Sequence, residues 1–382
     1  MAGRPVDVAL PVGNAQHLVE LQLMPALERH PLRTHEPERA ELHVIGTMPF
    51  ASSVLSQAQG DPEGHARRMQ SFAAELMRCE PFVGRDRPFL LIHSSMNTNL
   101  MGRAALRALI RGDLVVASAD PMFALDARYG GLVPPDFARS VQRGVTIPYL
   151  AHHYAREASP GAGPPTSSRS GIMFHGGVSR RDFGLRPAVL ELLRKMDSRK
   201  TDSRRTGNGA DSASRIRVDL RVGEMSRGNQ SALHLAFDLP TYAASGHAYK
   251  AASMCIVPAG DTPSSRRLFD SLAAGCVPVL ARSYYSMLAF NRSFETSLPF
   301  PRSISWREMS IWLTPEVRGA WKIGCDRQGR DWLARWHESR CALEAMRRNG
   351  RSAFRNHLDY AENPGESLVN PTRCRTPPCS RM

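Results

Sequence analysis

The hydrophobic positions of the chain are most regular between residues 252 and 282. Two short apolar runs, at 253–257 and 277–280, have the length and composition of strands that are buried on both faces. Between these runs, turn residues precede an apolar face at helical spacing, made by Ser265, Leu268, Phe269, Leu272 and Ala273. Gly275 follows, where the end of a helix favours a left-handed residue. The pattern predicts a βαβ unit whose helix opens at the carboxyl end of a strand, where open α/β sheets bind ligands.

The first turn of this predicted helix carries residues that suit a phosphate. Ser264 or Ser265 can cap the helix, whose free backbone N–H groups and partial positive charge favour an anion. Arg266 and Arg267 add two forked donors, and a hydrogen bond to a charge contributes about 1.5–3 kcal/mol. Asp270, one turn on, is an acceptor suited to sugar or ribose hydroxyls. The alternative from the residues alone is an i,i+4 surface pair of Arg266 and Asp270, worth less than about 0.5 kcal/mol.

Outside this unit, short apolar runs alternate with amphipathic stretches, which is typical of the α/β class. Helical periodicity predicts helices at 15–30 (with Pro25 interrupting), 64–79, about 185–196, 242–252 and 328–357. Apolar runs predict strands at 41–46, 86–93, 114–118, 145–149, 171–174 and 216–220. The polar, low-complexity stretch 197–214 predicts a disordered loop.

The composition indicates a globular protein with two domains. The chain has 382 residues, of which 42% are hydrophobic, and this length is sufficient for two domains with cores of their own. Residues 155–170 are rich in Ala, Ser, Gly and Pro, so we expect the linker there. The predicted division is therefore 1–155, 171–360 and a loose tail at 361–382.

The net charge of +14 leaves acidic polysaccharide, anionic lipid or nucleic acid as possible partners on charge alone. No zinc-finger spacing, ribonucleoprotein motif or heptad array supports nucleic acid, so we expect no nucleic-acid partner. The seven cysteines show no CxxC spacing, which argues against a structural zinc site. Cys255 and Cys276 lie in or beside apolar runs and are expected to be ordinary buried thiols.

A longer motif adds a family resemblance to these observations. The run DTPSSRRLFDSLAAGCVPVL, from Asp261 to Leu280, resembles the donor-site signature of the exostosin-like glycosyltransferases, the enzymes of heparan sulfate and plant cell-wall polysaccharides. The run RTHEPERA at 33–40 and the run VTIPY at 145–149 resemble further segments of the same family, in the same order. The resemblance implies a GT-B architecture, with two Rossmann-like domains whose parallel sheets face a central cleft. It also implies transfer, with inversion, from a nucleotide sugar, usually a UDP-sugar, bound to the carboxyl-terminal domain.

The resemblance also suggests a catalytic base in the first domain. The strand at 86–93 ends in His93, where the family places a cleft-facing histidine that is usually followed by an acidic residue. Here Ser94 follows, so His93 itself is the candidate base, with a polar strand-end histidine as the alternative. Other acids that the sequence does not rank are Asp113, Asp120, Asp126 and Glu157.

In the second domain, the resemblance adds donor-binding candidates after the strand that begins near residue 171. Gly177 would let the backbone approach the donor, and Arg180 or Arg186 could reach a phosphate. Trp306 is expected to pack in the core or at a domain interface rather than to serve as a sugar platform. No Asp-x-Asp motif is present, so the interpretation requires no metal and no cofactor beyond the nucleotide-sugar donor.

Family members are typically Golgi proteins with an amino-terminal membrane anchor, and the resemblance implies that location. No apolar run here reaches the roughly 18 residues of a membrane span, and the first residues lack a signal-peptide core. The expectation is therefore a truncated or a soluble relative. The partners we expect are a nucleotide-sugar donor and a glycan acceptor. Two alternatives remain open: a non-catalytic carbohydrate-binding relative, and a basic polyanion-binding protein.

Overall fold

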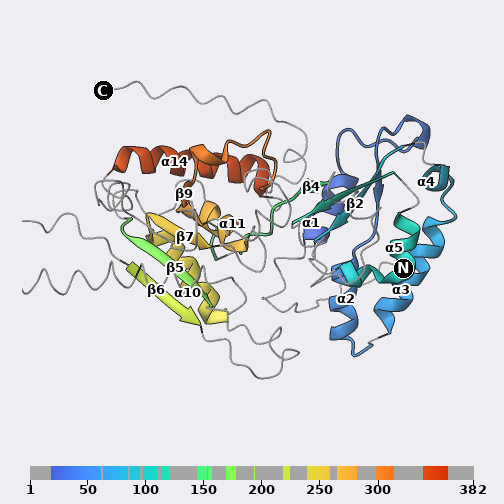
Figure 1. Cartoon of the computed structure of the whole chain (residues 1–382), viewed down its shortest axis with the longest axis horizontal. Coiled ribbons are helices and arrows are strands. Elements are labelled where there is room, and N and C mark those ends of the chain that lie inside the picture. The colour runs from blue at the N-terminus through green and yellow to red at the C-terminus, as the bar shows by residue number, and fades with distance from the viewer. Residues whose placement is uncertain are drawn as a thin grey trace, which may run out of the picture.

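The computed structural model describes the residues 19–61, 63–84, 87–94, 98–110, 113–119, 144–152, 154–156, 169–177, 193, 218–223, 239–258, 265–281, 298–313 and 339–359. These residues form two parallel β-sheets that lie side by side along the long axis of the molecule, each with its own helices (Figure 1). The α/β class with two parallel sheets, expected from the sequence, is confirmed.

The amino-terminal sheet has the strand order β1-β2-β3-β4, and every neighbouring pair is parallel. Its strands are β1 (His43–Ile45), β2 (Phe89–His93), β3 (Leu114–Ser118) and β4 (Val145–Thr146). The helices of this half are α1 (Val19–Glu28), η2 (Pro37–Arg39), α2 (Pro49–Ala58), α3 (Gly64–Leu76), α4 (Glu80–Gly84), η3 (Thr98–Met101) and α5 (Gly102–Leu109). Pro25 lies inside α1 without ending it.

The carboxyl-terminal sheet has the order β6-β5-β7-β8-β9, again all parallel. Its strands are β5 (Ile172–Gly177), β6 (Val218–Gly223), β7 (Met254–Pro258), β8 (Val277–Ala281) and β9 (Ile311–Leu313). The helices are α10 (Leu239–Ala251), α11 (Arg266–Ala273), η7 (Trp306–Glu308), α14 (Arg340–Ala353) and the π-helical turn η8 (Phe354–Leu358). The predicted βαβ unit is therefore β7, α11 and β8.

Helix α11 is held from several sides. It contacts β7, β8, α10, α14 and η8, and its apolar face is buried as the sequence predicts. Gly275, just after the helix, has a φ of 70°, which is the left-handed conformation expected there. The same glycine leaves room for the Arg351 side chain of α14, whose Nε would lie 2.5 Å from an added Cβ. Position 275 therefore requires glycine for its backbone and for this close approach.

One buried hydrophobic cluster joins the two halves of the chain. It contains Val19, Ile92 and Ala117 from the amino-terminal half and Leu268, Phe269 and Phe354 from the carboxyl-terminal half. An ion pair of 2.8 Å between Arg156 and the buried Asp359 connects the segment after β4 to the end of η8. The described residues 144–152 and 154–156 thus pack against both halves.

Some predictions lie outside the described residues. The helix expected at 185–196, apart from residue 193, and the loop expected at 197–214 are among them, as are the residues 157–168 that contain most of the predicted linker. The domain boundaries therefore stay a prediction. Among the described residues, no helix is both long enough and apolar enough to cross a membrane.

Candidate functional site

The start of α11 and the end of β5 meet through Arg267. Ser265 is the N-cap, because its Oγ accepts a hydrogen bond of 3.3 Å from the backbone N–H of Arg267. The Nε of Arg267 donates to the carbonyl oxygen of His175, at 2.9 Å, two residues before the end of β5. The terminal nitrogens Nη1 and Nη2 make no hydrogen bond within the part of the chain that the structure describes. Arg267 is thus anchored through Nε, and its two terminal nitrogens are available to a ligand.

The neighbouring Arg266 is engaged differently. Its Nε lies 3.4 Å from Oδ2 of Asp270, so the i,i+4 pair of the alternative interpretation does form. The pair is largely buried rather than on the surface, and Oδ1 of Asp270 accepts a 2.7 Å hydrogen bond from the backbone N–H of His152. Burial raises the pKa of Asp270, while Arg266 and the bond from His152 oppose the rise. Both oxygens of Asp270 have protein partners, so its expected contact with donor hydroxyls stays a prediction.

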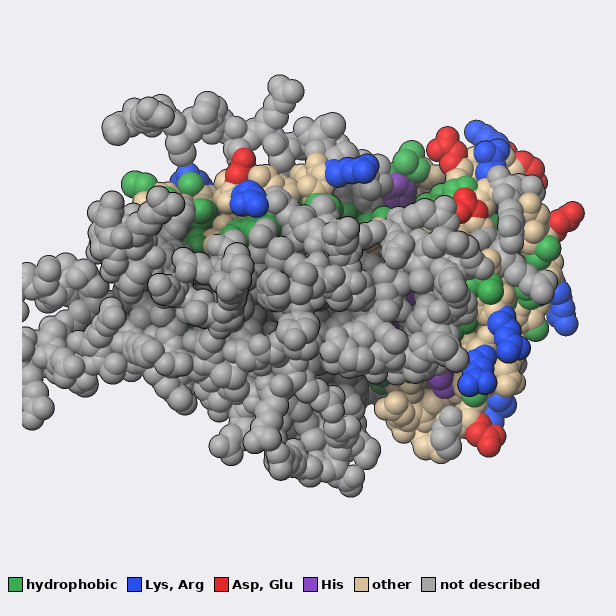
Figure 2. All heavy atoms as spheres, in the orientation of Figure 1, with side chains coloured by type: hydrophobic (Ala, Val, Ile, Leu, Met, Phe, Trp, Pro, Cys, Tyr) green, Lys and Arg blue, Asp and Glu red, His purple; other side chains and the backbone are tan. Residues whose placement is uncertain are grey.

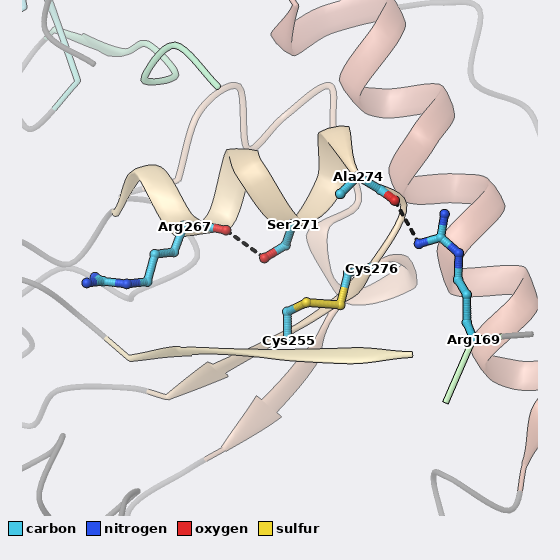
Figure 3. Close-up of a disulfide and its surroundings, with 6 residues drawn as sticks. All are labelled: Arg169, Cys255, Arg267, Ser271, Ala274 and Cys276. Atoms are coloured by element: carbon cyan, nitrogen blue, oxygen red, sulfur yellow. Dashed lines mark hydrogen bonds between the residues drawn. A yellow bond between two sulfur atoms is a disulfide. The ribbon is translucent and has the colours of Figure 1, made fainter. Parts of the chain in front are cut away.

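A disulfide lies directly beside this helix and corrects the expectation of free thiols. Cys255 of β7 is bonded to Cys276, which immediately precedes β8 (Figure 3). The parallel register pairs Met254 with Val277, and the two cysteine Cα atoms are 5.9 Å apart, within the usual range for a disulfide. The prediction was wrong because strand register is not visible in the spacing of the cysteines.

The carboxyl end of α11 is capped by a distant arginine. Nη1 of the buried Arg169 donates a hydrogen bond of 2.7 Å to the carbonyl oxygen of Ala274 (Figure 3). A cation at this end satisfies a free carbonyl and complements the helix dipole. Within the helix, the Ser271 Oγ donates to the carbonyl of Arg267 at 2.6 Å. The helix that carries Arg267 is therefore fixed at both ends and by the disulfide.

The candidate base His93 ends β2 and is buried, with 1% of its surface exposed. Its backbone is paired with Ser118, the last residue of β3, so it lies at the carboxyl edge of the amino-terminal sheet. Asp113 precedes β3 at the opposite edge, five residues before Ser118, and so roughly 16 Å away along the strand. This position argues against Asp113 as an alternative base. The acids Asp120, Asp126 and Glu157 lie outside the described residues.

Sequence reasoning missed a buried acid close to His93. Glu20 of α1 is completely buried, and its carboxylate accepts hydrogen bonds from the backbone N–H and the Oγ of Ser94, at 3.3 and 2.9 Å. Burial raises the pKa of Glu20 from 4.5 to about 7, against the opposing effect of its hydrogen bonds. The sequence did contain a signal for this acid. Glu20 precedes Leu23 by three residues and Met24 by four, so helical spacing places it on the apolar face of α1.

Of the remaining candidate residues, the structure describes Gly177 and Trp306. Gly177 is the last residue of β5, on the strand that receives Arg267. Ser264, Arg180 and Arg186 lie outside the described residues. Trp306 is fully buried and its Nε1 donates to the carbonyl of Pro299 at 2.9 Å, which confirms a packing role.

The surface charge is mixed on the visible face of the amino-terminal half. Figure 2 shows Lys and Arg interspersed with Asp and Glu at the right of the view, over the helices of the first sheet, rather than a patch of one sign. The described residues contain no group of three or more His, Cys, Asp or Glu side chains that could hold a metal ion. The mixed charge adds no support for a polyanion site on this face.

The family comparison agrees with this geometry. The model of the Exostosin GT47 domain matches residues 6–317, which is most of the chain. The chain therefore belongs to the exostosin GT47 family.

Two relatives illustrate how far the similarity reaches. A protein of Arabidopsis thaliana described as probable arabinosyltransferase ARAD1 is 29% identical over 198 residues, which is 52% of this chain. The match spans only 33% of that plant protein's length. Sucrose-phosphate synthase from Thermosynechococcus elongatus is a structural neighbour that is 12% identical, with a TM-score of 0.34, over 88% of this chain and 79% of its own. The structural similarity is too low to carry an argument about the site.

Proposed function

We propose that the chain transfers a sugar, with inversion, from a nucleotide-sugar donor of the UDP-sugar class to a glycan or glycoprotein acceptor. The observation that carries the proposal is the position of Arg267. Its Nε is fixed on the His175 carbonyl, at the carboxyl end of β5, while its backbone belongs to the first turn of α11. A diphosphate at this place would meet a helix N-terminus and a forked guanidinium together.

The proposed chemistry follows from where charge develops. As the bond between the sugar and the diphosphate breaks, negative charge grows on the departing phosphate oxygens. Arg267 would stabilise that charge, which is the electrostatic part of catalysis. His93, at the carboxyl edge of the amino-terminal sheet, would accept the proton of the attacking hydroxyl as the general base. Arg266 and Asp270 would keep α11 fixed against the segment that contains His152.

The disulfide supports the location that the family implies. The Cys255–Cys276 bond is one that persists in oxidising compartments and is rare in the cytosol. We therefore propose that the chain works in the lumen of the secretory pathway, consistent with a Golgi location.

A binding screen by titration calorimetry tests the donor assignment. UDP, UDP-arabinose, UDP-galactose and GDP-mannose would be titrated into the folded wild type, with UDP-arabinose included because of the arabinosyltransferase relative. Arg267→Ala should weaken UDP binding roughly 10- to 150-fold, the equivalent of one lost charged contact. Arg267→Lys, which keeps the charge but not the fork, should recover part of the affinity. Arg302→Ala, on an exposed turn of the same half, is the matched control and should bind as the wild type does.

The outcomes separate the alternatives. Binding together with release of the sugar supports the transferase. Binding without turnover, even with a range of glycan acceptors, favours a non-catalytic carbohydrate-binding relative. A folded wild type that binds none of these nucleotides contradicts the proposal.

A further inference from the structure

Glu20 occupies an unusual place for an acid, because it has no exposed surface and accepts four hydrogen bonds from three residues in two parts of the chain. Its Oε1 accepts from the backbone N–H of Phe50, at 3.4 Å, and from both donors of Ser94. Its Oε2 accepts from the backbone N–H of Ala51, at 3.3 Å. Burying a carboxylate is costly unless hydrogen-bond donors surround it, and these four hydrogen bonds meet that requirement for Glu20.

The first of its partners is the start of α2. This helix has Met48 at its N-cap position, with no side-chain cap, and Pro49 as its first residue. The backbone N–H groups of Phe50 and Ala51 belong to the first turn of the helix, whose N–H groups have no carbonyl partner within the helix. Glu20 satisfies both, and its charge suits the positive end of the helix dipole. In effect, α1 supplies the cap that the sequence of α2 lacks.

The second partner is the residue that follows the candidate base. Ser94 is held to Glu20 by its backbone N–H and by its hydroxyl, so the chain direction just after His93 is fixed by α1. On its other side, His93 is fixed by the parallel pairing of its backbone with Ser118. The two restraints together fix the backbone from which the His93 side chain projects.

We propose that Glu20 is a positioning residue for the transfer reaction: its carboxylate joins the first turn of α2 to Ser94 and thereby holds His93 at the edge of the sheet. The inference rests on the proposed function, in which His93 receives the acceptor proton. It assigns a role to a residue that acts through its neighbours, since both oxygens of the Glu20 carboxylate are engaged by donors of the chain itself. A carboxylate from α1 is thus held beside position 94, which is occupied by a serine and not by an acidic residue.

Two variants and one control test this role in the full chain. Glu20→Gln keeps the size of the side chain, but its NH2 group cannot accept a hydrogen bond. Either the donors now bonded to Oε1 or the donor now bonded to Oε2 therefore lose their acceptor. Ser94→Ala removes the hydroxyl contact and keeps the backbone one. Glu28→Gln, on the exposed side of the same helix, is the matched control and should behave as the wild type does.

Three quantities are measured: UDP release from UDP-arabinose and UDP-galactose, the Kd for UDP, and amide hydrogen exchange. Glu20→Gln should lower kcat roughly 10- to 100-fold, because small displacements of a reacting group have large effects. The Kd for UDP should stay within about twofold, since the donor helix belongs to the other sheet and takes part in none of the hydrogen bonds of Glu20. Ser94→Ala should lower kcat by less. Amide exchange should accelerate at Phe50, Ala51 and Ser94 in Glu20→Gln and remain unchanged in Glu28→Gln.

A purely structural role would lower the melting temperature of both variants and leave the kcat of the folded protein unchanged, which would overturn the proposal. Unchanged amide exchange in a folded Glu20→Gln protein would overturn it as well. If Glu20→Gln does not fold, Ser94→Ala decides, because it removes one contact only. A wild type without turnover or UDP binding refutes the proposed function, and the exchange rates at Ser94 then still decide whether Glu20 fixes the end of β2.

Discussion

Removing the Cys255–Cys276 disulfide gives a prediction whose size follows from the structure. The two cysteines are 21 residues apart, and in the chain-entropy model a loop of this length stabilises the fold by roughly 3 kcal/mol. Both side chains are also buried, at 0% and 2% exposure, so each Cys→Ala change loses about 1 kcal/mol of packing in addition. We therefore expect each single variant to lose about 4 kcal/mol and the double variant about 5 kcal/mol.

The pattern of these losses distinguishes a disulfide from two buried thiols. With a disulfide, the double variant costs little more than either single variant, because the bond is already lost in each. With free thiols, the single changes would cost about 1 kcal/mol each and would add.

The assay is equilibrium urea unfolding without reductant, followed by the same measurement in dithiothreitol. Dithiothreitol should destabilise the wild type and leave the double variant unchanged, and Cys79→Ala, at a described free cysteine, is the control. Additive single variants, or alkylation of both Cys255 and Cys276 in the unreduced, unfolded protein, would refute the reasoning.

Two further predictions concern buried contacts of the fold. The pKa of Glu20 in the folded chain is about 7 against an ordinary 4.5, so the folded state holds the proton more tightly and its stability falls as the pH rises between these values. The fall should reach up to roughly 3 kcal/mol in the wild type and be absent in Glu20→Gln, as urea unfolding at pH 5 and pH 8 would show; equal pH dependence in both would contradict it. Gly246→Ala should lower the melting temperature, because an added Cβ would lie 2.5 Å from the carbonyl oxygen of Tyr154, and such overpacking costs about 1–3 kcal/mol. Gly46→Ala, whose Cβ would lie 3.7 Å from its nearest neighbour, Met24, is the control, and equal melting temperatures for the two variants would disprove the clash.

The parts of the fold that could be predicted are those with local causes. The strand β3 was predicted with its observed ends, because a buried parallel strand is a continuous apolar run. Ser265 and Gly275 marked the two ends of α11 through their cap chemistry. By contrast, β5 continues beyond its apolar residues through His175, Gly176 and Gly177, since pairing with β6 extends it.

The site was harder to predict because its contacts are distant in the chain. The i,i+4 spacing indicates the pair of Arg266 with Asp270, but only the position of the His175 carbonyl, 92 residues away, shows that Arg267 is anchored on β5. Glu20 meets Ser94 across 74 residues, so no spacing rule could join them. The disulfide depends on strand register in the same way.

Amide hydrogen exchange of the wild type, with and without saturating UDP, tests the central claim most directly. The account predicts that UDP slows exchange in the first turn of α11, residues 265–268, and at the end of β5, residues 175–177, because α11 carries Arg267 and β5 holds its Nε. Exchange along β2, residues 89–93, should stay unchanged. Protection confined to the amino-terminal sheet, or UDP binding that protects neither α11 nor β5, would contradict the assignment of this helix as the donor site.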